Sequence, residues 1–81
     1  MTMNTFMKVS IIYFSNRPEL SYGHIYMSIN SCQLELSHDM SLDDAEAEME
    51  KLKERLGAEP TRSVNRYNSD MHYVELYGFL D

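Results

Sequence analysis

The chain has 81 residues, of which 43% are hydrophobic and 25% charged, and thirteen acidic residues against seven basic ones give a net charge of −6. This length predicts one small domain over residues 1–81, and the apolar and aromatic content excludes global disorder. A single cysteine excludes a disulfide scaffold, and the lack of an apolar run of about 20 residues excludes a membrane span. The negative charge disfavours direct nucleic-acid binding, and we expect a cytoplasmic protein without membrane contact.

Residues 7–14 form the first predicted strand, because β-branched and aromatic side chains dominate it. Both of its alternating sets are apolar, with Val9 and Ile11 in one and Ile12 and Phe14 in the other. Such a strand is typical of the centre of a sheet covered on both faces. Residues 15–23 follow as a predicted loop, bounded by the breakers Pro18 and Gly23.

Residues 24–37 alternate between apolar and polar side chains on either side of Asn30-Ser31, which predicts a hairpin. A two-residue turn would pair three apolar couples across it, namely Ile29 with Cys32, Met27 with Leu34 and Ile25 with Leu36. This register would bury Cys32 as an inert thiol. Because Ser31 suits a primed turn less well than glycine, a slightly longer loop is the alternative.

Residues 41–56 are predicted to form the single helix. Ser41 is a favourable N-cap with Asp44 three residues later, and Gly57 suits the C-terminal cap. The apolar positions recur at helical spacing: Leu42, Ala45, Met49, Leu52 and Leu56.

Two more strands are predicted after the helix, a weak one at residues 62–66 and a strong one at residues 71–79, with a turn at residues 68–70 between them. The order is therefore β-β-β-α-β-β. It indicates an α+β fold in which an antiparallel-rich sheet of four to five strands carries one helix on one face.

One face of this sheet has no helix to cover it. If the aliphatic sets pack under the helix, the opposite face carries Tyr26, Tyr73, Tyr77 and Phe79. Were they to cluster, they would present roughly 600–1,000 Å², more than the largest apolar patch of a typical monomer. Such a surface is typical of a protein–protein interface, whereas a solvated sheet face is the simpler alternative. Base stacking is disfavoured, because the strands offer only Lys8, Arg62 and Arg66 as cations.

Seven acids and no base lie in residues 35–50, so this segment accounts for the whole negative charge. Asp43, Asp44, Glu46 and Glu50 belong to the predicted helix, where acids near the N-terminus are favoured by the helix dipole. A solvated helix face is the simpler interpretation. The alternative is a negative patch that docks on a basic protein surface, often a nucleic-acid site.

The sequence contains no catalytic or metal-binding motif. His24, His38 and His72 lack ligand spacing, and there is no glycine-rich phosphate loop. We therefore predict no enzymatic activity, no cofactor and no metal.

The function that fits best is a non-catalytic protein-binding module. We expect a small acidic inhibitor or regulator that acts stoichiometrically on a larger protein, such as a nucleic-acid-handling one, of the kind found in phage and mobile elements. The contact residues would be Tyr26, Tyr73, Tyr77 and Phe79, with Asp43, Asp44, Glu46 and Glu50 steering association. The alternatives are a homodimeric structural domain and a single-strand nucleic-acid binder that uses the sheet aromatics.

Overall fold

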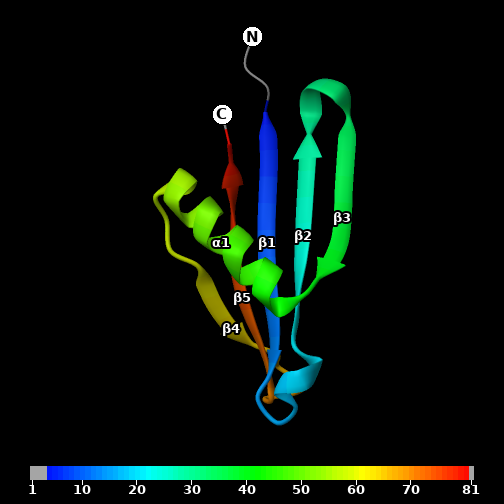
Figure 1. The fold of residues 1–81 in the computed structure, drawn as a ribbon, viewed down its shortest axis with the longest axis vertical. Helices are drawn as coiled ribbons and strands as arrows, with labels where there is room; N and C mark the ends of the chain where they lie inside the picture. The colour runs from blue at the N-terminus through cyan, green and yellow to red at the C-terminus, as the bar shows by residue number, and fades with distance from the viewer. Residues whose placement is uncertain (1–3, 81) are drawn as a thin grey trace.

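A computed structural model describes residues 4–80 as one antiparallel sheet of five strands with one helix packed on it (Figure 1). The strands lie in the order β3-β2-β1-β5-β4. The elements are β1 (Thr5–Phe14), β2 (Tyr22–Ile29), β3 (Leu34–Met40), α1 (Leu42–Leu56), β4 (Thr61–Val64) and β5 (Met71–Phe79). The predicted α+β class and the order β-β-β-α-β-β are confirmed.

β1 is the central strand, as its two apolar sets predict, and it begins at Thr5, two residues before the predicted start. Val9 is fully buried under α1. Ile12, on the face opposite α1, is only 8% exposed. The strand is therefore buried on both faces over its middle part.

The helix matches its prediction closely. The Ser41 hydroxyl accepts a hydrogen bond from the backbone N–H of Asp44 at 3.2 Å, which satisfies one of the free donors of the first turn. Gly57 ends the helix with φ 60°, and its N–H donates to the Lys53 carbonyl. The apolar side of α1 packs on β1 and β5, and together they form the core: Val9, Ile11, Ala45, Met49, Leu52 and Leu76.

The predicted hairpin register is wrong by two residues. The structure pairs Ile29 with Leu34 and Met27 with Leu36, because residues 30–33 form the connection. Gln33 takes the positive φ of 52° that this longer turn requires. Since side chains alternate with period two, the shift leaves each residue on its predicted face but removes Cys32 from the strand, and Cys32 is exposed in the turn.

The predicted loop at residues 15–23 also ends too late, because β2 already begins at Tyr22. Gly23 therefore lies inside a strand. A Cβ atom at this position would collide with the Cβ atom of Ala45 on α1. The glycine is required by the close approach of helix and sheet and does not act as a chain breaker.

α1 crosses the sheet diagonally and leaves part of its own face uncovered (Figure 1). Its N-terminal end lies over β2, where Ala45 meets Gly23, and its C-terminal end lies on the β4 side. The far half of the β2–β3 hairpin therefore has no helix above it, and Leu34 and Leu36 are 44% and 47% exposed.

Candidate functional site

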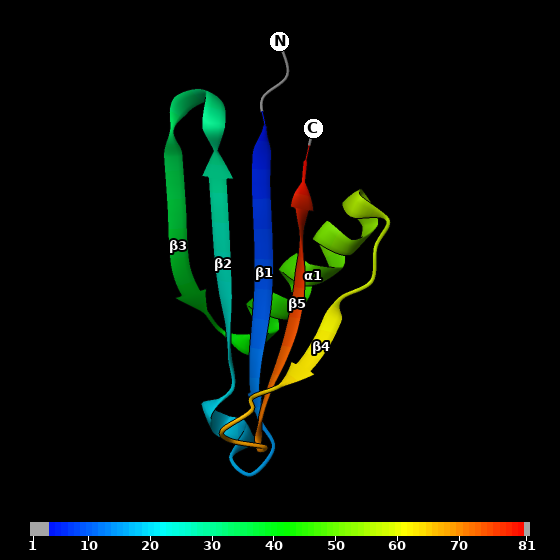
Figure 2. The ribbon, with the colours of Figure 1, turned by 180° about the vertical axis from the view of Figure 1, so that it is seen from behind.

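The predicted aromatic residues lie on the face of the sheet opposite α1, which is the face turned toward the viewer in Figure 2. The strand register places them there, since Phe6, Lys8 and Ile12 alternate with the residues under the helix. Lys8 pairs with both Tyr26 and Tyr77, Phe6 pairs with Phe79, and Ile12 pairs with Tyr73. We call this surface the open face.

Three of the four predicted aromatic residues gather around a fourth ring that the sequence analysis missed. The Phe6 ring centroid lies 6.0 Å from that of Tyr26, 6.1 Å from that of Tyr77 and 5.5 Å from that of Phe79. Two of these contacts are edge-to-face, a favourable geometry for aromatic pairs. We call Phe6, Tyr26, Tyr77 and Phe79 the aromatic cluster. Tyr77 and Phe79 keep 58% and 61% of their surface exposed.

Tyr73 lies on the same face but apart from the cluster. Its partner Ile12 is six residues along β1 from Phe6, which corresponds to about 20 Å of strand. The Tyr73 hydroxyl accepts a hydrogen bond from the Asn65 amide at 2.7 Å and donates to the Met71 sulfur at 3.4 Å. Tyr73 therefore anchors the chain that joins β4 to β5 at the other end of the open face.

Glu75 lies between Tyr73 and Tyr77 on β5, so a charged residue separates these two regions. Lys8, which stands between Tyr26 and Tyr77 in the register, forms a half-buried ion pair with Glu75 at 3.1 Å. On β3, the acids Glu35 and Asp39 also lie on the open face. The charged strand residues of this face are therefore three acids, Glu35, Asp39 and Glu75, and one base, Lys8. The open face is therefore net negative.

The acids on β3 are held by their neighbours on β2. Glu35 accepts a hydrogen bond from the Tyr26 hydroxyl at 2.9 Å, and this bond, with a smaller contribution from desolvation, raises the pKa of Tyr26. The His24 ring lies 2.9 Å from both the Asp39 carboxylate and the Ser37 hydroxyl. These contacts orient the Glu35 and Asp39 carboxylates along the β3 edge of the open face.

The four helix acids lie on the other side of the sheet. Asp43 and Asp44 occupy the first turn of α1, where they complement the helix dipole. Glu46 and Glu50 follow on the same helix and line a cleft. The eight predicted residues therefore form two surfaces on opposite faces, and a single flat partner surface cannot contact both.

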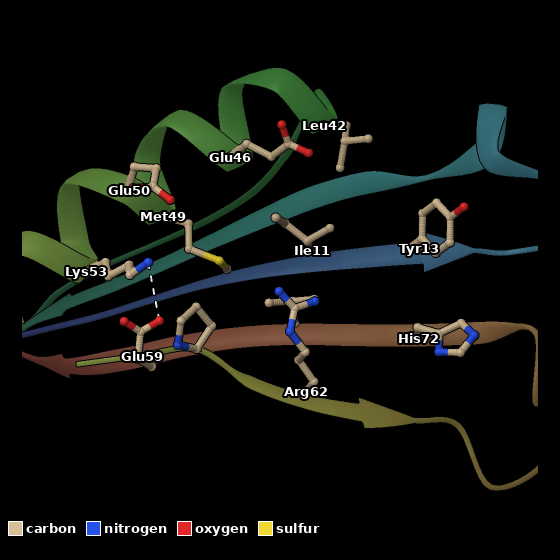
Figure 3. A pocket seen from close by; sticks show the side chains of 12 residues that line it. Ile11, Tyr13, Leu42, Glu46, Met49, Glu50, Lys53, Glu59, Arg62 and His72 are labelled. Carbon is tan, nitrogen blue, oxygen red and sulfur yellow. Dashed lines mark ion pairs between the residues drawn. The ribbon is translucent and has the colours of Figure 1, made fainter.

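The cleft lies between α1 and the strands β4 and β5 and has a volume of about 610 Å³ (Figure 3). Ile11, Met49 and Val74 form apolar parts of its lining, and a Lys53–Glu59 ion pair of 3.3 Å stands at its rim. Arg62 and His72 also line it. No buried side-chain nitrogen or oxygen atom in residues 4–80 lacks a hydrogen-bond partner, so the cleft contains no buried polar atom that a ligand would have to satisfy.

Within the described part of the chain, no three His, Cys, Asp or Glu side chains are placed to hold a metal ion. No helix among these residues is long and apolar enough to cross a membrane. No family model, curated protein or solved structure matches the chain.

Proposed function

We propose that this protein is a non-catalytic binding module that uses its open face to contact a larger protein. The observation that carries the proposal is the aromatic cluster, in which the half-buried Phe6 supports the strongly exposed rings of Tyr77 and Phe79. Rings held in place before binding lose little conformational entropy when a partner covers them. Aromatic side chains of this kind supply much of the binding energy at protein interfaces.

The charge of the open face supports a partner with a basic surface. Neither Glu35 nor Asp39 forms an ion pair with a lysine or arginine within residues 4–80, since Glu35 contacts the Tyr26 hydroxyl and Asp39 contacts the His24 ring, whereas Lys8 is already paired with Glu75. Complementary charge raises the association rate and excludes acidic partners. A module that covers the basic surface of a nucleic-acid-handling protein would act as a stoichiometric inhibitor or regulator of that protein.

The same charges argue against the single-strand nucleic-acid alternative. Stacking of bases on aromatic rings needs cations nearby to neutralise phosphates. The one strand cation of the open face is Lys8, and its ammonium group lies 3.1 Å from the Glu75 carboxylate. A nucleic acid would have to compete with that ion pair and would also meet Glu35 and Asp39.

The test begins with the solution mass of the purified protein, measured by light scattering over a concentration series. A monomer near 9.5 kDa leaves the aromatic cluster free for another protein. A dimer that Tyr77→Ala dissociates would contradict the proposal and would instead support self-association through the open face.

The second step compares baits that differ in one tyrosine. Tyr77→Ala removes a ring of the aromatic cluster, and Tyr67→Ala removes a ring that is 89% exposed and makes no ring contact within residues 4–80. A genuine partner should be retained by the wild type and by Tyr67→Ala, be lost with Tyr77→Ala, and rebind as a purified protein in a one-to-one ratio. Equal retention by both variants would reject the open face as the binding surface.

A further inference from the structure

The free edge of β3 is a second feature that points to a partner. β3 and β4 are the two edge strands of the sheet, and β4 has only four residues. β3 has seven, six of them exposed, and pairs with β2 in an unbroken register from Met40 to Leu34. Edge strands are usually protected by short length, charged side chains (lysine above all), proline, a bulge or a covering segment. β3 contains no proline or lysine and its register has no bulge, and its charged side chains are the acids Glu35 and Asp39.

The direction of the backbone groups on β3 follows from hydrogen bonds elsewhere in the sheet. The Asn30 N–H donates to the Asn4 carbonyl, so the backbone of Asn30 faces β1. Because successive residues of a strand face opposite neighbours, the backbone of Ile29 faces β3 and that of its partner Leu34 faces β2. The same alternation directs the N–H and C=O groups of Glu35, Ser37 and Asp39 away from the sheet.

Most of these outward groups have no partner in the described residues. The exception is the Asp39 carbonyl, which lies 3.0 Å from the ring nitrogen Nδ1 of His38. The N–H groups of Glu35, Ser37 and Asp39 and the carbonyls of Glu35 and Ser37 have no hydrogen-bond partner within residues 4–80. An added strand would find these donors and acceptors at the spacing of an antiparallel ladder.

The side chains on the two faces of β3 specify the chemistry of that strand. Leu34 and Leu36 lie on the α1 side of β3 and are exposed. Glu35 and Asp39, four residues apart, lie on the open face. Residues directly opposite each other on neighbouring strands interact most favourably when apolar meets apolar and opposite charges meet.

We propose that the β3 edge binds an extended segment of a partner protein in which basic residues at positions i and i+4 alternate with aliphatic ones. The basic side chains lie opposite Glu35 and Asp39, and the aliphatic side chains pack on Leu34 and Leu36. The segment adds a sixth strand to the sheet, so main-chain hydrogen bonds supply affinity and the charges supply specificity. This inference deepens the proposed function, on which it rests for the existence of a protein partner.

A second copy of the chain fits this edge poorly. An antiparallel pair of β3 strands centred on Ser37 would place Glu35 of one copy opposite Asp39 of the other, twice. Like charges directly opposite each other destabilise a strand pair. Pairing of β3 with a second copy of itself is therefore disfavoured, whereas pairing with a basic strand is favoured.

The probe is a blocked seven-residue peptide, Val-Lys-Val-Thr-Val-Lys-Val, which presents lysines at i and i+4 in either direction. It is added to the ¹⁵N-labelled full-length protein, and the amide signals are followed by NMR. We expect saturable shifts and slowed hydrogen exchange at the N–H groups of Glu35, Ser37 and Asp39. The control peptide carries glutamate in place of both lysines and should bind at least about tenfold more weakly.

A matched pair of variants isolates the backbone contribution. Ser37→Pro removes an outward N–H, which the β2–β3 ladder does not use, and proline is tolerated on such an edge. Ser37→Ala loses the same hydroxyl contact to His24 but keeps the N–H. Ser37→Pro should weaken binding of the lysine peptide about tenfold or more relative to Ser37→Ala. Equal affinities for the two variants would overturn the proposal.

Two measurements distinguish a failure of the β3 edge proposal from a failure of the proposed function. If Ser37→Pro fails to fold, the exchange rates of the wild-type β3 amides decide, because unchanged rates at saturating peptide would also overturn the proposal. The aromatic cluster is tested independently by Tyr77→Ala against Tyr67→Ala. Suppose that Tyr77→Ala loses a partner which the wild type retains, and that the lysine peptide does not bind. The proposed function would then stand, and only the proposal for the β3 edge would be rejected.

Discussion

Phe6 and Phe79 face each other across β1 and β5, with their ring centroids 5.5 Å apart and their planes inclined by 66°. Phe6 is half-buried and contacts two further rings, whereas Phe79 is 61% exposed. The two phenylalanines therefore have different roles. Phe6 supports the aromatic cluster, and Phe79 is the part of it that a partner can cover.

The first prediction separates these roles by stability. Phe6→Ala should lower the free energy of unfolding by about 2 kcal/mol, since truncating a fully buried phenylalanine costs about 3–5 kcal/mol and this ring is partly exposed. Phe79→Ala should cost about 1 kcal/mol or less because most of the ring remains in water. Urea denaturation of both variants measures the difference. A larger cost for Phe79→Ala would contradict the assignment of Phe6 as the support.

The second prediction concerns the contact between helix and sheet. Gly23→Ala places a Cβ atom against the Cβ atom of Ala45, which cannot rotate away. We expect a loss of about 2–3 kcal/mol in the free energy of unfolding. Gly78→Ala is the matched control, because its Cβ atom would meet the terminal methyl groups of Leu56 at 2.9 Å. Those methyl groups can move, so this change should cost about half as much or less.

A double variant shows whether the collision with Ala45 is the cause. Ala45→Gly removes the opposing Cβ atom at a cost of about 1 kcal/mol for a glycine inside a helix. Combined with Gly23→Ala, it should recover part of the lost stability, measured as a favourable coupling energy in a double-mutant cycle. Strictly additive losses would show that the strain arises elsewhere.

The helix and the faces of the strands were predictable because each depends on local patterns. Ser41, the apolar spacing and Gly57 together specify α1 at both ends. The alternation in residues 24–29 places Tyr26 on the open face whatever the length of the following turn. For the same reason the two-residue error in the hairpin register changed the pairing but moved no residue to the other face.

The details of the candidate site depended on contacts that no local pattern records. Phe6 lies one residue before the predicted first strand at residues 7–14, although it alternates with Lys8 and so continues the set of residues on the open face. Gly23 resembles a loop glycine until Ala45, distant in sequence, is placed above it.

The third prediction concerns the hydrogen bond between Tyr26 and Glu35. The pKa of Tyr26 is raised above its ordinary value of 10.0, chiefly because Glu35 accepts the hydroxyl proton in a hydrogen bond. Since the folded-state pKa exceeds the unfolded one, the stabilisation is fully present below about pH 10 and is lost as the pH rises through the folded-state value. Glu35→Ala should return the pKa of Tyr26 toward its ordinary value and reduce this alkaline loss of stability.

The titration can be followed by ¹³C NMR of the tyrosine ring carbons, with Tyr26→Phe to assign the Tyr26 signal. The alkaline loss is measured by urea denaturation between about pH 9 and pH 11. Alanine removes the acceptor oxygens of Glu35 together with its charge, so the variant tests the hydrogen bond that chiefly raises the pKa. Identical Tyr26 titrations in the wild type and in Glu35→Ala would contradict this account.

The fourth prediction compares two pairs of acids that carry equal charge on opposite sides of the sheet. Glu35 and Asp39 border the open face, whereas Glu46 and Glu50 lie on α1. Packed layers are about 10 Å apart, which is comparable to the distance over which physiological salt screens charge, about 8 Å. For a basic partner that binds the aromatic cluster, the acids of β3 should therefore dominate the steering.

Stopped-flow association with that partner provides the measurement. The double variant Glu35→Gln/Asp39→Asn should slow association by about fivefold or more at low salt, whereas Glu46→Gln/Glu50→Gln should change it by less than about twofold. Both variants remove two negative charges, so a difference between them reflects position and not net charge. The difference should shrink as salt is added, because screening weakens long-range attraction. If instead the helix pair slowed association more, α1 would be the face that the partner approaches first.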